Sequence, residues 1–189
     1  MNLIPSIADA FQQVVSDTSA AIAADTSIDW GTLPKVVYFL HGNPREIVKV
    51  LQEYTNSPAK KDKKYPLIAL MRDIKEGLSN QSTGIGTKFS CKILIINLTK
   101  PEYRSTEREI KSFKRILHPI LSEFINQLGQ CAQFYCPTVD EMEIVKYDRY
   151  FWGTVEVDKN ILNDFVDAVE LEINNLKLKN NNCPMGITI

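Results

Sequence analysis

Two apolar segments decide the fold: YPLIALMRDI at residues 65–74 and KFSCKILIINL at residues 88–98. Their leucine and isoleucine content predicts two strands of one sheet, and Pro66 suits the beginning of a strand, where a missing N–H is tolerated. The polar stretch 79–86 between them is too long for a tight hairpin turn. We therefore expect it to form a protruding, mobile loop, and such loops often carry function.

The residues before this pair predict a strand, a turn and a helix. Residues 35–40 have strand character and end at Gly42. Asn43 is suited to cap a helix, with Pro44 in the first turn and Glu46 three residues after the cap. Further upstream, apolar residues recur at three- and four-residue steps over 3–23, which predicts an N-terminal amphipathic helix.

The clearest helical pattern runs from Ile110 to Leu128, with one apolar stripe and charges opposite it. Ser105 or Thr99 is suited to cap this helix, Pro119 to kink it and Gly129 to end it. Residues 133–136, 143–152 and 167–178 then have strand character. In the last of these the alternation breaks at Asn174-Asn175, which allows a β-bulge. A helix over 161–178 is the competing interpretation.

Together these elements predict an α+β fold, with a central, mainly antiparallel sheet, flanking helices and an additional N-terminal helix. We divide the chain into the N-terminal helix (1–24), a single α+β domain (25–179) and a C-terminal tail (180–189). The 189 residues, 44% of them hydrophobic, suffice for one buried core.

The composition argues against several classes of protein. The net charge of −1 gives no general attraction to nucleic acid or to an anionic membrane. No apolar run reaches the ~18 residues of a membrane span, and the N-terminus lacks the features of a secretory signal. We therefore expect a soluble protein whose four cysteines are free thiols in a reducing cytoplasm.

No residue pattern predicts a catalytic, cofactor-binding or metal site. His41 and His118 lack an accompanying nucleophile or carboxylate, and Cys131 and Cys136 do not have Cys-x-x-Cys spacing. The stretch 84–88, GIGTK, lacks the spacing of a phosphate-binding loop. An exposed strand face accounts for Asp164, Asp167, Glu170 and Glu172 without a cation.

Basic residues and aromatic residues each have a simple structural interpretation. Residues 60–64, KKDKK, predict a solvated loop. A solvated helix face accounts for Arg104, Arg108, Lys111, Lys114 and Arg115, although contact with DNA is an alternative. Core and interface packing accounts for Tyr147, Tyr150, Phe151 and Trp152 better than base stacking does.

Two stretches of the sequence together carry a resemblance to a known family. The first is YFLHGNPREI (38–47), followed by YPLIAL (65–70) and DIKE (73–76). The second is KYDRYFWG (146–153), followed by LNDFVDAVELEI (162–173). These stretches resemble the tail-terminator and neck-protein family of tailed bacteriophages. The resemblance spans residues 36–178 and contains no catalytic motif.

This resemblance implies a non-enzymatic structural protein of the virion, assembled in the host cytoplasm into a hexameric or dodecameric ring. The ring would join the head and portal to the tail and contact neighbouring portal, connector or tail proteins. Its lumen would surround the passing DNA, and no membrane is expected as a partner. We expect the contacts between subunits or rings to lie in two loops. Their residues are Lys60, Lys61, Lys63 and Lys64, and Ser82, Thr83, Gly84, Ile85 and Gly86.

Three alternatives stay open at this point. A different head-completion or connector protein would bind neighbouring virion proteins in the same way, at another level of the neck. A small α+β enzyme would need a pocket near Gly42, and a nucleic-acid-binding module would depend on the lysines of residues 60–64.

Overall fold

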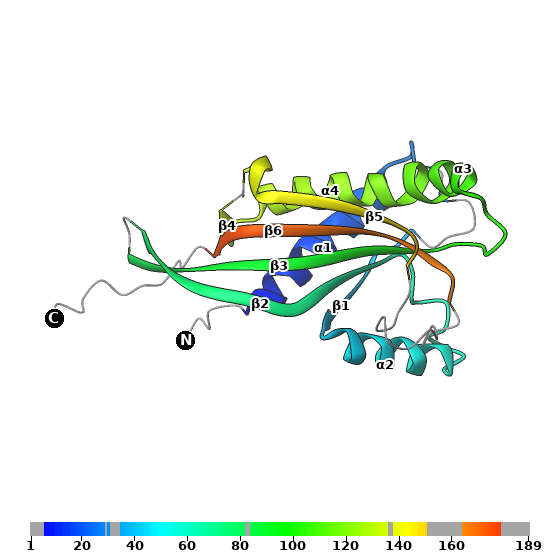
Figure 1. Cartoon of the computed structure of the whole chain (residues 1–189), viewed down its shortest axis with the longest axis horizontal. Helices are drawn as coiled ribbons and strands as arrows, with labels where there is room; N and C mark the ends of the chain where they lie inside the picture. The colour runs from blue at the N-terminus through cyan, green and yellow to red at the C-terminus, as the bar shows by residue number, and fades with distance from the viewer. Residues whose placement is uncertain are drawn as a thin grey trace.

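The computed structural model describes residues 6–28, 30, 35–81, 84–135, 138–150 and 164–178, and for residues 72–81, 84–87 and 139 it describes the backbone alone. In this part of the chain, six strands form one curled sheet with helices on both faces (Figure 1). The architecture is mixed α and β and is compatible with the expected α+β class.

The sheet has the order β1-β2-β3-β6-β4, and β5 also pairs with β6. Its strands are β1 (Tyr38–Gly42), β2 (Leu67–Gln81), β3 (Gly84–Leu98), β4 (Phe134–Tyr135), β5 (Met142–Tyr150) and β6 (Val166–Leu178). Strand β1 runs parallel to β2, and the other pairs are antiparallel. The prediction of a mainly antiparallel sheet is therefore confirmed.

Hydrogen-bonded capping boxes begin the first two helices. Helix α1 (Ile7–Ala24) begins after Ser6, whose hydroxyl accepts from the Asp9 N–H at 3.1 Å. Helix α2 (Pro44–Thr55) begins after Asn43, whose Oδ1 accepts from the Glu46 N–H at 3.0 Å. Glu46 Oε2 accepts in turn from the Asn43 N–H at 3.1 Å. The predicted cap of α2 is thus confirmed.

The third helical region has three parts: α3 (Ser105–Arg108), the π-helix η1 (Glu109–Leu117) and α4 (His118–Gln130). The prediction that Thr99 or Ser105 caps it was wrong. The preceding residue is Arg104, whose N–H donates to Glu107 Oε2 at 3.3 Å. Pro119 lies in the first turn of α4, directly after the π-helical segment, and the helix ends one residue beyond Gly129.

The sheet separates two groups of buried side chains. On one face, α1, η1 and α4 pack against the sheet. There the ring centroid of Phe11 of α1 lies 6.4, 6.3 and 5.1 Å from the ring centroids of Phe89, Phe124 and Phe134. On the other face, Ile47, Val48 and Leu51 of α2 cover part of the sheet. Burial of aliphatic and aromatic side chains on both faces stabilises the sheet as a central layer.

Strand β6 contains the bulge that the sequence allowed. Asn174 and Asn175 together lie opposite Ser90, and Asn175 has φ 61°. The strand interpretation is confirmed over residues 166–178, and the competing helix is wrong there. A second bulge in β5 places Asp148 and Arg149 opposite Asp167, and Arg149 has φ 57°. Both bulges put their second residue in the left-handed region.

The prediction of a loop over residues 79–86 was wrong. Strands β2 and β3 stay paired from Lys75↔Ser90 to Gln81↔Gly84, so most of this polar stretch is strand. Backbone pairing within a hairpin does not require apolar side chains, which explains why hydrophobicity failed to indicate it. The remaining predicted residues, Ser82 and Thr83, lie outside the described residues.

Candidate assembly surfaces

The β2–β3 hairpin forms an arm at one end of the molecule. Figure 1 shows its far end projecting past the helices. Of the residues predicted to make contacts here, Gly84, Ile85 and Gly86 belong to β3 and pair with Gln81, Asn80 and Ser79. The arm can therefore present an ordered backbone ladder to a neighbour instead of a loose loop.

The predicted lysine loop consists of turns between α2 and β2. The amides of Lys60 and Lys61 both donate to the Ser57 carbonyl at 3.0 Å. Lys60, Lys61 and Lys63 are exposed, as expected of a solvated loop, and the Lys60 ammonium lies 5.2 Å from the Tyr54 ring centroid. These three lysines are available for contact with a partner.

Lys64 differs from the other lysines, and its prediction as a solvated residue was wrong. It is buried, and its ammonium donates to Asp164 Oδ2 at 2.5 Å and to Thr55 Oγ1 at 3.1 Å. The Tyr65 hydroxyl lies 3.1 Å from the same carboxylate oxygen. These contacts satisfy the buried charge and fix the loop to the segment that precedes β6.

A small cleft lies between β1 and the lysine loop. It is lined by Tyr38, Phe39, Leu40, Leu51, Tyr54, Lys63, Lys64 and Leu67. Burial, and secondarily the charge of Asp62, raises the pKa of Tyr38. The cleft therefore combines aromatic and aliphatic walls with the lysine loop at its rim.

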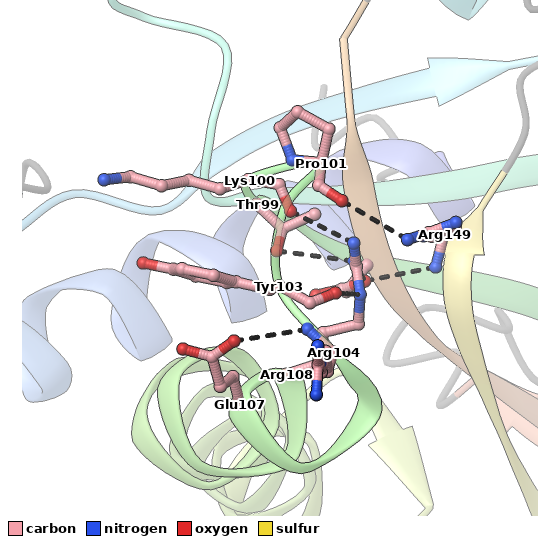
Figure 2. A network of polar contacts seen from close by, with 9 residues as sticks. Thr99, Lys100, Pro101, Tyr103, Arg104, Glu107, Arg108 and Arg149 are labelled. Atoms are coloured by element: carbon pink, nitrogen blue, oxygen red, sulfur yellow. Dashed lines mark hydrogen bonds and ion pairs between the residues drawn. The ribbon is translucent and has the colours of Figure 1, made fainter.

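Arg108 was predicted on a solvated helix face, and this prediction was wrong because its guanidinium is buried against the sheet. Nη1 donates to Asp167 Oδ1 at 2.5 Å, Nε to the Tyr103 carbonyl at 3.0 Å, and Nη2 to the Lys100 carbonyl at 3.1 Å. Figure 2 shows the loop that carries these carbonyls gathered around the side chain. Asp167 is likewise buried, so the prediction of an exposed acidic strand face fails for it.

The same network reaches β5 through Arg149. Its backbone N–H donates to Asp167 Oδ1 at 3.1 Å, and its Nη2 donates to the Pro101 carbonyl at 3.3 Å (Figure 2). One carboxylate oxygen thus connects α3, β6 and the bulge of β5. This network fixes the end of the sheet at which β3 and β5 finish and β6 begins.

That end of the sheet carries an excess of positive charge and is called the basic end. Strand pairing places the starts of β1, β2 and β6 and the ends of β3 and β5 together there. Its exposed charged residues include Lys35, Lys60, Lys61, Lys63, Lys100, Arg104 and Arg149, with Asp62, Glu102 and Asp148. It also exposes Val36, Leu98 and Phe165, by 44, 46 and 48%.

A second group of charged side chains lies where β5 begins, along the middle of β6. Its acids are Asp140, Glu141, Glu143, Glu170 and Glu172, and its lysines are Lys92 and Lys146. Glu143 and Glu172 lie directly across from each other, while the Lys92 ammonium lies 3.0 Å from Glu172 and 3.3 Å from Glu170. Ile144 is exposed here by 48%, and Tyr135, opposite Lys177 near the end of β6, is exposed by 44%.

The sequence predicted contacts in the lysine loop, which lies at the basic end, but it did not indicate that Lys100 and Arg149 lie there too. It also did not single out the charged group on β5 and β6, for which the available signal was the acids at 140–143. At the basic end, Lys100 and Arg149 come from segments far apart in the sequence. Only the strand pairing brings such segments together.

The histidines, thiols and aromatic residues named above occupy separate places. His41 is exposed on β1, and His118 is half-buried at the start of α4, where burial lowers its pKa. Cys91 is buried in β3, which raises the pKa of its thiol to about 12. Among the residues that the structure describes, no group of three or more His, Cys, Asp or Glu side chains is placed to hold a metal ion.

Tyr147 and Tyr150 confirm the prediction that they act as packing residues. Their ring centroids lie 5.5 Å apart at 72°, and both pack against the buried group that α2 covers. Burial raises the pKa of Tyr150 to about 12. Phe151, Trp152, Cys136 and Cys183 lie outside the described residues.

Comparison with known proteins gives no match: no protein-family model and no curated protein matches this chain. Within the described part of the chain, none of the helices has the length and apolar character needed to cross a membrane.

Proposed function

We propose that this chain is a non-enzymatic structural subunit of a ring in the neck or tail of a bacteriophage, where it joins the head to the tail. The proposal starts from the resemblance of residues 38–76 and 146–173 to tail-terminator and neck proteins. The single structural observation that supports it is the arm, in which β2 and β3 stay paired out to Gln81 and Gly84, past the helices.

An arm of this kind suits assembly because its paired backbone extends past the helices of its own subunit. Among the side chains of β2 and β3 that the structure describes, buried ones lie in Leu67–Met71 and Phe89–Ile96, nearer the helices. A hairpin that extends beyond its own core offers contact area to another chain. In a ring, each copy would extend its arm onto a neighbouring subunit or onto the adjacent ring.

Native mass spectrometry of the purified chain, with electron microscopy of the same sample, tests this function. A closed hexamer or dodecamer is the expected result. A chain that stays monomeric at every concentration, and also in the presence of the portal, connector and tail proteins of its own virion, would contradict the proposal.

A further inference from the structure

The exposed cations of the basic end lie close together without carboxylate partners. In the described part of the chain, ion pairs are formed by other cations, among them Lys64, Lys92, Arg108, Lys111 and Lys146. The seven cations of the basic end form none there, and they outnumber its three exposed carboxylates. A chain of net charge −1 thus concentrates unpaired positive charge at one end of its sheet.

These cations extend across the sheet from β1 to β5. Lys35 precedes β1, the lysine loop precedes β2, Lys100 follows β3 and Arg149 belongs to β5. The strands between these positions follow the order β1-β2-β3-β6-β5, which at ~4.8 Å between neighbouring strands spans roughly 19 Å. The major groove of DNA is about 12 Å wide, so a row of this length can reach phosphates on both of its sides.

The loops that carry the cations are fixed to the sheet. The Lys64 ammonium binds Asp164 and Thr55, which holds the lysine loop in place. The Arg108 guanidinium binds the carbonyls of Lys100 and Tyr103, which holds the loop that follows β3 (Figure 2). The positive charges are therefore positioned before any partner binds.

The type of cation favours a phosphate partner over a protein partner. Lysines make up most of the group: Lys35, Lys60, Lys61, Lys63 and Lys100. Lysine is depleted from protein–protein interfaces, whereas its ammonium binds phosphate as a point charge.

We propose that the basic end binds the phosphate backbone of duplex DNA without reading its sequence. This inference rests on the proposed ring function, which brings DNA past each subunit, and it orients the basic end towards the channel. Phosphate contacts carry no direct sequence information, so the same cations can hold any stretch of DNA that passes. Such binding is sensitive to salt and lets a protein slide along the duplex.

Charge reversal at two parts of the basic end tests this contact. The first variant carries Lys61→Glu and Lys63→Glu, and the second carries Lys35→Glu and Lys100→Glu; all four positions are exposed. The control variant, Lys49→Glu with Lys114→Glu, makes the same charge change at exposed positions of α2 and η1. Fluorescence anisotropy of a labelled duplex of about 20 base pairs measures binding to the full chain, from about 50 to 200 mM salt.

The wild type should bind two duplexes of unrelated sequence equally well. The logarithm of its affinity should fall with the logarithm of the salt concentration, with a slope of about −4 for roughly four phosphate contacts. Each charge-reversal variant should bind at least about tenfold more weakly and reduce the slope by about two, because each lost lysine removes roughly one phosphate contact. The control should bind like the wild type.

Native mass spectrometry of the same samples separates this inference from the ring function. A wild type that forms a ring but does not bind the duplex at about 50 mM salt overturns the DNA contact and leaves the ring function standing. A wild type that binds the duplex but stays monomeric, also with the proteins of its own virion, supports the DNA contact and overturns the ring function.

The variants supply the remaining outcomes. If both charge-reversal variants bind DNA as tightly as the wild type, or if the control is weakened equally, the basic end is not the DNA surface. If the charge-reversal variants no longer self-associate, the basic end is a contact between subunits instead, for which the exposed Val36, Leu98 and Phe165 would account. Either result overturns the inference.

Discussion

Asp167 Oδ1 lies 2.5 Å from Nη1 of Arg108, and the two side chains are 0 and 2% exposed. Removing one partner of such a pair leaves an uncompensated buried charge. We therefore expect Asp167→Asn to lower the free energy of unfolding by about 3–5 kcal/mol, measured by urea denaturation.

Asp148→Asn is the control for this prediction, because Asp148 is exposed on the neighbouring strand. It should change the free energy of unfolding by less than about 0.5 kcal/mol. Equal effects of the two substitutions would show that the buried pair does not stabilise the fold.

Lys64 and Lys63 are adjacent but should respond differently to substitution. Lys64→Gln removes the charged contact with Asp164 and should cost about 1.5–3 kcal/mol of stability. Lys63→Gln at an exposed position should have little effect on folding. Thermal unfolding of the two variants measures the difference, and similar midpoints would contradict the burial of Lys64.

Asn175 should tolerate glycine far better than valine, because its φ of 61° is in the left-handed region. A residue with a Cβ pays roughly 1–2 kcal/mol in that conformation, and a β-branched one pays at least as much. Both substitutions remove the Asn175 side chain, so the difference in urea midpoint between them isolates the backbone effect. The pair Asn174→Gly and Asn174→Val, at the preceding position, should lack this preference for glycine.

His118 should make the protein less stable in mild acid. Burial lowers its pKa in the folded state below the ordinary 6.5, so the unfolded chain binds the proton more readily. The stabilisation is present above pH 6.5 and is lost as the pH falls from 6.5 through the lower folded pKa.

Unfolding free energies of the wild type and His118→Gln at pH 7.5 and pH 5 test this expectation. The wild type should lose more stability between these two pH values than the variant does. His41→Gln, at an exposed position, is the control and should follow the wild type. An identical loss in the wild type and in His118→Gln would exclude His118 as the cause.

The arm should be removable without unfolding the protein. Replacing residues 79–86 by Asn-Gly joins Leu78 to Thr87, which already pair, through a two-residue turn. We expect an unchanged circular dichroism spectrum and a similar urea midpoint, together with weaker ring assembly in sedimentation velocity. A large loss of stability would show that the arm belongs to the core.

The sequence was sufficient to predict elements whose signal is local. Periodicity indicated α1 and α4, the Asn43 to Glu46 spacing indicated the start of α2, and the break at Asn174-Asn175 indicated the bulge. Each of these depends on residues within a few positions of one another. Periodic and capping patterns are therefore the reliable part of such a prediction.

The residues whose exposure was predicted wrongly are those whose ion-pair partners are distant in the sequence. Lys64 and Asp164 are 100 positions apart, and Arg108 and Asp167 are 59 apart. Taken singly, each of these charged residues indicated solvent exposure, because the cost of burying an ion is high without its partner. Only the sheet register shows that the partners meet.

The two bulges lie near the two ends of β6, and each has its second residue's N–H directed to a side chain on the facing strand. Arg149 N–H donates to Asp167 Oδ1 at 3.1 Å, and Asn175 N–H lies 3.5 Å from Ser90 Oγ. The eight residue steps from Asp167 to Asn175 span roughly 26 Å at about 3.3 Å per residue. Strand β6 is therefore held in register near both of its ends, and a slip of one residue would have to break both contacts at once.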